Sequence, residues 1–284
     1  MRAIALHADV LVATSAIWQT NCVIVRGGAG EGQGLEGRLD DRGREGGEGE
    51  RGPERAPRGG ETFVVDSPVL PDELDALPAL VEQAGFPAPS GLLATHGDWD
   101  HLLGRLAFPG VALGVAQSTA ARMQAAPGEA QRELRAFDQE HFLERERPLS
   151  LGAVQALPIP GGCGIGAREL ALHPTPGHTG DGLAVLIELA GVLVCGDYLS
   201  PVELPLLGSG GTAEEYLQTL ERLRGLIEGV EHVVPGHGRV LGRERALEIL
   251  EDDLSDVREG GLSGATRLRR SSRSARPRRS ARPR

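Results

Sequence analysis

The sequence predicts an α/β protein, an αββα sandwich in which two mixed β-sheets are packed between outer helices. Three observations support this fold class. Apolar runs with strand character alternate with segments of helical spacing along most of the 284 residues. Side chains of metal-ligand type stand beside Gly or Pro directly after strand-like runs, as expected for loops at one edge of a sheet. Apolar residues make up 40% of the chain, which is enough to build the core of one such domain.

The first half of the chain predicts an antiparallel layer, a helix and the strand that precedes the first motif. The three strands of the layer are expected at residues 8–17, 20–25 and 62–66. A helix is expected over residues 71–84, because apolar residues recur there at helical spacing, and Pro78 is expected to interrupt it. Residues 92–95 predict a further strand, and a short helix is expected after His101.

The second half predicts three longer helices and a hairpin. A charged helix is expected over residues 129–147, with Phe142 on its apolar face together with two earlier apolar residues. The two strands of the hairpin are expected at residues 183–189 and 192–195. Thr212 and Glu215 form a capping-box pattern at the start of the next helix, and residues 247–257 have the apolar spacing of a last one.

The segment Thr-His-Gly-Asp-Trp-Asp-His at residues 95–101 contains four potential metal ligands in six consecutive residues. They are His96, Asp98, Asp100 and His101. Imidazoles and carboxylates at this density would repel one another or stay unsatisfied if buried alone, whereas a bound divalent cation makes such a cluster favourable. A single Asp before a helix is often an N-cap, but capping does not account for four ligands together. The segment therefore predicts a metal site.

Three further ligands occur in matching settings later in the chain. His178 lies in a Pro-Gly-His-Thr segment, Asp197 follows the strand-like residues 192–196, and His237 lies in a Pro-Gly-His-Gly segment. Each is expected on a loop at the end of a strand. Seven ligands are enough for two metal ions, because a catalytic zinc site uses about four positions and leaves one open to water.

The order and spacing of these motifs resemble the metallo-β-lactamase fold superfamily, whose usual first motif is His-x-His-x-Asp-His. The resemblance covers about residues 5–257 and implies the αββα fold. The ligand sets that it implies are His96, Asp98 and His178 for the first metal and Asp100, His101 and His237 for the second, with Asp197 bridging both.

The chain departs from the family pattern at position 98, where the family usually has His and this sequence has Asp. A carboxylate is a harder ligand than imidazole, so we expect two divalent ions, zinc first, with iron or manganese better tolerated than in an all-imidazole site. Flavodiiron oxidoreductases resemble this family and carry a carboxylate at the same place. A diiron oxidoreductase, flavodiiron-like or persulfide-type, therefore stays open as an alternative.

The resemblance implies a dinuclear metal-dependent hydrolase, in which a metal-bridging hydroxide attacks a small ester, lactone or thioester. Asp100 and Asp197 are expected to orient the nucleophile or accept its proton. Tyr198 is predicted to donate a hydrogen bond to the developing oxyanion, with packing under the loop at residues 199–207 as the alternative. Only 39 residues separate Asp197 from His237 and 47 follow His237, so neither the insertion of nuclease members nor the substrate domain of glyoxalase II-like thioesterases is expected.

Two segments lack the composition of a folded domain. Residues 26–60 are mostly Gly, Arg and Glu and predict a disordered insertion loop between two strands. Residues 261–284 predict a disordered Arg-rich tail, which leaves residues 1–260 as one domain. Such a tail supports a third hypothesis, nucleic-acid binding through phosphate contacts, which the net charge of −10 and the lack of interleaved aromatic residues oppose.

Cysteine content and hydropathy bear on the compartment and the partners. Cys22, Cys163 and Cys195 are too few and too unevenly spaced for a disulfide framework, so a reducing, cytoplasmic compartment is expected. No stretch approaches the roughly 20 apolar residues that span a bilayer. We therefore expect a small-molecule substrate and no membrane partner, while the oligomeric state is not predicted.

Overall fold

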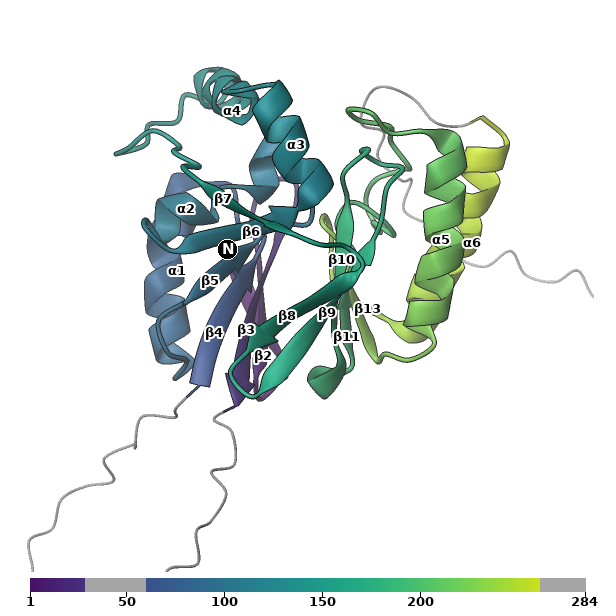
Figure 1. Cartoon of the computed structure of the whole chain (residues 1–284), viewed down its shortest axis with the longest axis horizontal. Helices are drawn as coiled ribbons and strands as arrows, with labels where there is room; N and C mark the ends of the chain where they lie inside the picture. Colours follow the sequence, from purple (N-terminus) through teal and green to yellow (C-terminus); the bar gives the residue numbers. More distant parts are fainter. Residues whose placement is uncertain (29–59, 261–284) are drawn as a thin grey trace, which may run out of the picture.

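The computed structural model describes residues 1–28 and 60–260, which form two mixed β-sheets packed between helices (Figure 1). The seven-stranded sheet follows the order of the chain: β1 (Arg2–His7), β2 (Val10–Thr14), β3 (Asn21–Gly28), β4 (Gly60–Val65), β5 (Gly91–Leu93), β6 (Ala112–Ala116) and β7 (Val154–Leu157). The six-stranded sheet has the spatial order β13 (Leu241–Gly242), β12 (His232–Val234), β11 (Val192–Val194), β10 (Leu183–Ile187), β9 (Arg168–Pro174) and β8 (Gly161–Ile165). The predicted fold class is confirmed.

Helices cover the outer face of each sheet (Figure 1). Those on the side of the seven-stranded sheet are α1 (Pro71–Gln83), the 3-10 turn η1 (Trp99–His101), α2 (Gly104–Ala107), α3 (Gln117–Ala125) and α4 (Glu129–Glu140). The other sheet is covered by α5 (Ala213–Ile227) and α6 (Arg243–Arg258), and a 3-10 turn, η2 (Glu188–Ala190), joins β10 to β11. None of the helices in the described ranges combines the length and the apolar character that crossing a bilayer requires.

The buried apolar side chains form three layers, one between the sheets and one under each set of helices. The layer between the sheets is built largely from aliphatic residues of facing strands, such as Val23 and Val65 from one sheet and Val185 and Val194 from the other. Aliphatic side chains dominate because aromatic residues are only 3% of the chain. Burial of both sheet faces and of the helices fixes the strand ends, and with them the loops that carry the predicted ligands.

The strands at the start of the chain differ from their predicted limits. The predicted strand at residues 8–17 is shorter, β2, and β1 was not predicted. The predicted insertion boundaries at positions 26 and 60 are wrong, because Arg26 pairs with Thr62 in the β3–β4 ladder and Gly28 pairs with Gly60. Arg26 is buried and its Nε donates to Asp9 Oδ1 at 2.8 Å, so it belongs to the folded sheet. The rest of that insertion, residues 29–59, and the predicted tail lie outside the described residues.

Two helix predictions also need correction. α1 continues through Pro78, because its apolar face is buried against the core and compensates for the missing hydrogen bond. α4 ends at Glu140 instead of residue 147, because Phe142 adopts a positive φ of 54° and its side chain is 93% exposed. Phe142 is therefore not on a buried helix face. The predicted hairpin and the Thr212 cap of α5 are confirmed.

Candidate metal centre

The predicted ligands lie on loops that leave strands of both sheets at one edge of the sandwich. The first motif follows β5, and the loop between β9 and β10 carries His178. Asp197 follows β11 and His237 follows β12, two parallel strands whose carboxyl ends reach the same edge. A Cβ at Gly236 would overlap with Asp197 Oδ1, so the Gly of the second Pro-Gly-His segment is needed for these two loops to come together.

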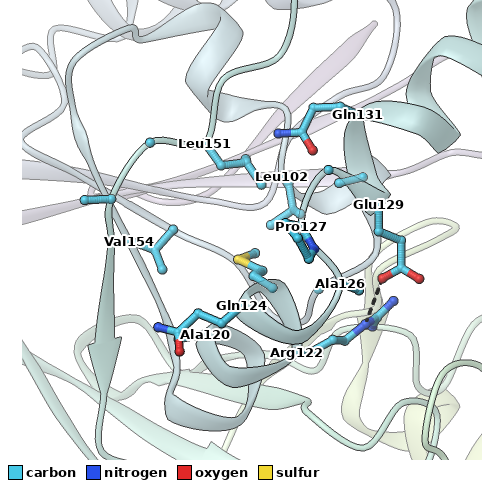
Figure 2. Close-up of a pocket in the computed structure, with 16 residues that line it drawn as sticks. Leu102, Ala120, Arg122, Gln124, Ala126, Pro127, Glu129, Gln131, Leu151 and Val154 are labelled. Atoms are coloured by element: carbon cyan, nitrogen blue, oxygen red, sulfur yellow. Dashed lines mark ion pairs between the residues drawn. The ribbon is translucent and has the colours of Figure 1, made fainter.

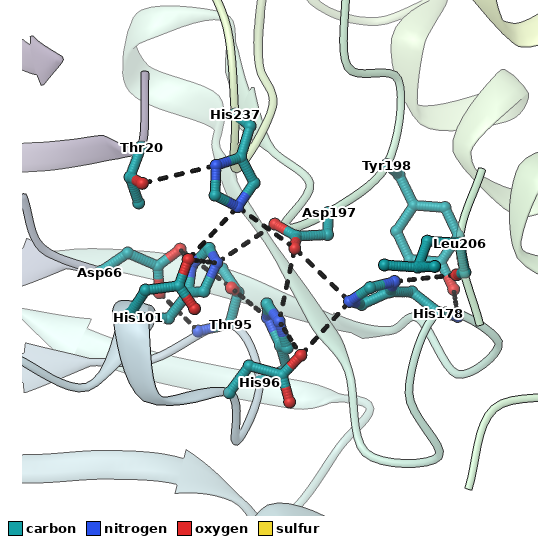
Figure 3. Close-up of polar contacts among 12 residues, drawn as sticks. Thr20, Asp66, Thr95, His96, His101, His178, Asp197, Tyr198, Leu206 and His237 are labelled. Atoms are coloured by element: carbon teal, nitrogen blue, oxygen red, sulfur yellow. Dashed lines mark hydrogen bonds and ion pairs between the residues drawn. The ribbon is translucent and has the colours of Figure 1, made fainter. Parts of the chain in front are cut away.

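One group of ligand atoms gathers around His96, His178 and Asp197, whose nearest ligand atoms all lie within 4.8 Å of one another (Figure 3). Asp197 Oδ2 is 3.7 Å from His96 Nε2 and 3.4 Å from His178 Nε2. Asp98 Oδ2 is 3.5 Å from each of the same two nitrogen atoms. This group, with Asp98 included, is called the first group below.

The second group consists of Asp100, His101 and His237, whose ligand atoms also lie within 4.8 Å of one another. His237 Nε2 is 3.4 Å from Asp100 Oδ2. Asp197 reaches this group too, because its Oδ1 is 3.2 Å from His101 Nε2 and its Oδ2 is 3.4 Å from His237 Nε2. The structure thus brings all seven predicted side chains together, with Asp197 between the two groups.

Several ligand atoms at the centre are buried without a hydrogen-bond partner among the described residues. They are the Nε2 atoms of His96, His101 and His178 and the Oδ1 atom of Asp197. Leaving a buried polar atom unsatisfied costs about 1–3 kcal/mol. Bound cations would satisfy all of these atoms, and imidazole nitrogen with carboxylate oxygen is a donor set that suits divalent zinc or iron. The residues present therefore fit a metal centre.

The other ring nitrogen of each histidine is held by an outer partner. The Nδ1 atoms of His178 and His237 lie 2.9 Å from the carbonyl oxygen of Leu206 and 3.1 Å from that of Trp18. A carbonyl oxygen can only accept, so Nδ1 carries a hydrogen in both rings, and in the neutral ring Nε2 presents its lone pair to the centre. This is the tautomer that metal-binding histidines need.

Asp66 and Thr95 do the same for the two histidines of the first motif. Asp66 accepts hydrogen bonds from the Thr95 backbone N–H at 2.8 Å and from its hydroxyl at 2.9 Å, and lies 3.0 Å from His101 Nδ1. Since the Thr95 hydroxyl donates to Asp66, it accepts from His96 Nδ1, 3.1 Å away. Neither residue was predicted to serve the site. Asp66 directly follows a strand, the same pattern that identified the ligands, and that pattern could have found it.

The side chains of the centre shift one another's pKa values. Burial lowers the pKa of His237, but the nearby carboxylates of Asp197 and Asp100 outweigh it and raise this pKa to about 10. Burial also opposes ionisation of Asp197, yet the surrounding histidines hold the pKa of its carboxyl well below the usual range. The cluster is thus built around carboxylates that stay ionised and hold positive charge close to them.

Two carboxylates near the centre have distinct environments. Asp98 stands at the N-cap position of η1, but its side chain makes no capping hydrogen bond, so the capping alternative does not hold for it.

Glu203 lines a small cavity with His178 and Asp197 and was not predicted to be near the site. Burial, reinforced by the charges of Asp197 and Asp100, raises the pKa of Glu203.

The Tyr198 hydroxyl is occupied by the backbone of the loop that carries His178. It accepts a hydrogen bond from the His178 N–H at 2.7 Å (Figure 3). It also lies 2.9 Å from the carbonyl oxygen of Pro176. The side chain is buried, and its ring lies 4.6 Å from that of Tyr216. This geometry favours a supporting role for Tyr198 beneath the loops over the predicted hydrogen bond to substrate.

Residues 58–237, more than half of the chain, match the family model of the metallo-beta-lactamase superfamily. The chain belongs to the metallo-beta-lactamase superfamily. The search of curated proteins found no match. Solved structures of the superfamily share its fold at low sequence identity.

A metallo-beta-lactamase from Pontibacter korlensis is 15% identical, with a TM-score of 0.58 over 90% of this chain and 98% of that one. A metallo-beta-lactamase family protein from Thermus thermophilus is 18% identical, with a TM-score of 0.61 over 90% and 82% of the two chains. The DIM-1 metallo-beta-lactamase exposed to ceftazidime is 18% identical, with a TM-score of 0.55 over 91% and 97%. At these identities the likeness shows the shared fold alone.

Proposed function

We propose that this superfamily member is a dinuclear metal-dependent hydrolase that acts on a small ester, lactone or thioester. The observation that carries the proposal is the convergence of seven ligand side chains into two groups that share Asp197. Nε2 atoms in both groups face the centre with no other partner among the described residues. When bound, two divalent ions act as a Lewis acid toward the substrate and lower the pKa of water towards neutrality.

The side chains have separate tasks in this proposal. His96, Asp98 and His178 would hold the first ion, the second group would hold the other, and Asp197 would serve both. Asp100 orients the attacking water and accepts its proton, because its Oδ2 already lies at the second group, 3.4 Å from His237 Nε2. The outer partners, such as Asp66, keep the rings oriented and so reduce the reorganisation that binding a metal requires.

Two features support a small substrate. α5 is the one helix between Asp197 and His237, so this stretch contains no additional domain. Trp18, whose carbonyl oxygen lies beside His237 Nδ1, keeps 43% of its side chain exposed and packs on Phe137 at 4.9 Å, which places an apolar surface next to the centre. An uncharged ester, lactone or thioester suits this combination of apolar surface and ligand carboxylates.

The test is a metal analysis of purified protein followed by a screen of chromogenic esters, lactones, thioesters and phosphodiesters. We expect two zinc ions per chain and hydrolysis of at least one of the first three classes, lost on chelation and restored by zinc. Hydrolysis that survives chelation, or activity confined to phosphodiesters, would contradict the proposal. Asp197→Ala provides the matched inactive control.

The second candidate function is redox chemistry at a diiron centre, which the carboxylate of Asp98 favours. An iron-loaded protein with visible absorption that turns over oxygen or a persulfide would support it, and a colourless two-zinc protein would remove it. Nucleic-acid binding through residues 261–284 stays a prediction, because that segment lies outside the described residues. Deleting residues 262–284 abolishes function under that hypothesis and changes turnover little under the hydrolase proposal.

We also propose a reducing, cytoplasmic location. Cys22 and Cys195 are buried free thiols, and burial raises the pKa of both, so neither is suited to forming a disulfide. Fractionation of cells expressing the tagged protein tests the location, and secretion of the protein would contradict it.

A further inference from the structure

We propose that Arg122 is a positioning residue for the first metal, because it restricts Asp98 to one ligand oxygen. The inference rests on the proposed metal centre and concerns the position at which this chain departs from the family motif. It assigns a partner to the unusual carboxylate, so that a site with Asp in place of His still behaves as a zinc site.

Asp98 divides its two oxygens between Arg122 and the centre. Arg122, on α3, places Nη2 2.8 Å from Asp98 Oδ1. Asp98 Oδ2 faces inward and is 3.5 Å from the Nε2 atoms of both His96 and His178. The Asp98 side chain is 28% exposed, more than any other ligand of the centre, so the surrounding protein alone does not fix its rotation. Arg122 supplies that restraint, since a guanidinium holds a carboxylate oxygen in a defined direction.

Arg122 is itself anchored from the side away from the metals. Its Nη1 donates to Asp181 Oδ1 at 3.2 Å, and Asp181 is buried. The Asp181 carbonyl oxygen accepts a hydrogen bond from Thr119 at 2.8 Å, which ties Asp181 to α3 as well. Nε of Arg122 lies 3.6 Å from Glu129 Oε2 at the wall of a cavity of about 410 Å³ (Figure 2). The guanidinium is therefore held among three carboxylates and cannot follow Asp98 if that side chain moves.

Gly97 leaves the space that this arrangement needs. A Cβ at position 97 would lie 2.9 Å from Asp181 Oδ2 and 3.3 Å from Arg122 Nη1. A side chain at position 97 would crowd both members of the pair, and glycine lets Asp181 and Arg122 approach the motif closely. Two residues of the motif and two from other segments thus form one contacting unit: Gly97, Asp98, Arg122 and Asp181.

The consequence for the metal is one of geometry. A carboxylate can offer a metal one oxygen or two, whereas an imidazole offers a single nitrogen. Because Asp98 Oδ1 accepts a charge-assisted hydrogen bond from Arg122, Asp98 offers the centre Oδ2 alone. It then resembles the single-atom ligand that the family usually has, and the first group keeps the low ligand number that suits zinc. The preference for iron or manganese that a free carboxylate would confer is thereby reduced.

A double-mutant cycle on zinc affinity tests the proposal, with zinc competed against a chromophoric chelator. We expect Arg122→Gln to lose about 10–100-fold in affinity for one of the two zinc ions, as is typical of an outer partner, and Arg122→Lys to lose less. In the Asp98→His background, Arg122→Gln should cause no such loss, because no carboxylate is left to restrain. Arg145→Gln is the matched control: it breaks another largely buried pair, with Asp138 at 2.9 Å, and should lower stability but leave zinc affinity unchanged.

Each other outcome overturns the idea. Unchanged zinc affinity in Arg122→Gln, with two ions bound by the wild type, removes the role of Arg122 and leaves the metal centre in place. An equal loss in the Asp98→His background shows that Arg122 acts only by stabilising the fold. A wild type that binds no zinc, iron or manganese removes both the metal centre and the role of Arg122. If Arg122→Gln does not fold, Arg122→Lys carries the same comparison.

Discussion

The two ligand groups of the centre are supported in different ways. His101 of the second group is completely buried. Its ring is held by Asp66, which follows strand β4 of the seven-stranded sheet. Asp98 of the first group is partly exposed and is held by Arg122 from a helix. The second group is therefore supported by a residue of the sheet edge, whereas the first depends on a guanidinium from helix α3. Changes to the two supports should therefore have separable effects.

The largest effect is expected from the one residue that the groups share. Asp197→Ala should abolish binding of both metals and lower turnover by more than about 100-fold, beyond what the loss of an outer partner causes. Elemental analysis of the purified variant measures the metal content. Asp138→Ala, which breaks only the remote pair with Arg145, is the control and should keep its metals. Equal metal content in wild type and Asp197→Ala would rule out the bridging role.

The second group is disturbed most directly through its outer partner Asp66, which reaches His96 of the first group only through the Thr95 hydroxyl. Asp66→Ala removes the acceptor of the His101 ring and of the Thr95 N–H and hydroxyl. We expect zinc affinity at one site to fall by about 10–100-fold and the free energy of unfolding to fall by about 2 kcal/mol or more. Anomalous diffraction should locate the weakened ion in the second group. Loss from the first group alone would contradict this account, because Asp66 contacts His101 directly and His96 only through Thr95.

The first group can be altered at its unusual ligand. Asp98→His should still bind two metals, with the ratio of zinc to iron and manganese increased in protein grown with all three. Inductively coupled plasma mass spectrometry of wild type and variant, prepared side by side, measures the ratio. An unchanged ratio would mean that Asp98, held by Arg122, selects metals no differently from a histidine at this position.

The pH dependence of the metal-free protein reports on the second group. Burial lowers the pKa of His237, but Asp197 and Asp100 raise it to about 10 in the folded chain. A pKa raised on folding stabilises the folded state below the unfolded value of about 6.5, and this contribution is lost as pH rises through about 10. Denaturant unfolding of metal-free protein should therefore show lower stability at about pH 9.5 than at about pH 7. His237→Gln should lessen this difference.

Zinc binding at neutral pH should release protons for the same reason, because zinc displaces the proton that His237 carries. Titration calorimetry in two buffers of different ionisation enthalpy measures the number released. Zinc binding without proton release at neutral pH would contradict the raised pKa.

The smallest effect is expected at Tyr198, which supports the first group through the loop of His178. Tyr198→Phe removes a hydroxyl bonded to that loop and should cost about 1 kcal/mol of stability, with turnover changed only slightly. A role in stabilising an oxyanion would instead lower turnover by about 100-fold or more. Steady-state kinetics alongside thermal unfolding distinguishes the two.

The fold and the convergence of the seven predicted side chains were predictable from sequence because both leave local patterns. His178, Asp197 and His237 each follow an apolar run and stand beside Gly or Pro, so their place at strand ends could be inferred. Arg122 and Asp181 were not predictable, since no local pattern links two residues 59 positions apart that meet only through the tertiary fold. β1 was missed because it is largely exposed, and an apolar run that is not buried does not by itself distinguish a strand.

The central claim is that the chain binds two metal ions that share Asp197, and a zinc titration of metal-free wild-type protein tests it most directly. Calorimetry with elemental analysis of the product should show saturation at two zinc ions per chain, and none for Asp197→Ala. Saturation below one ion per chain in the wild type, or the same binding in the variant, would contradict the claim.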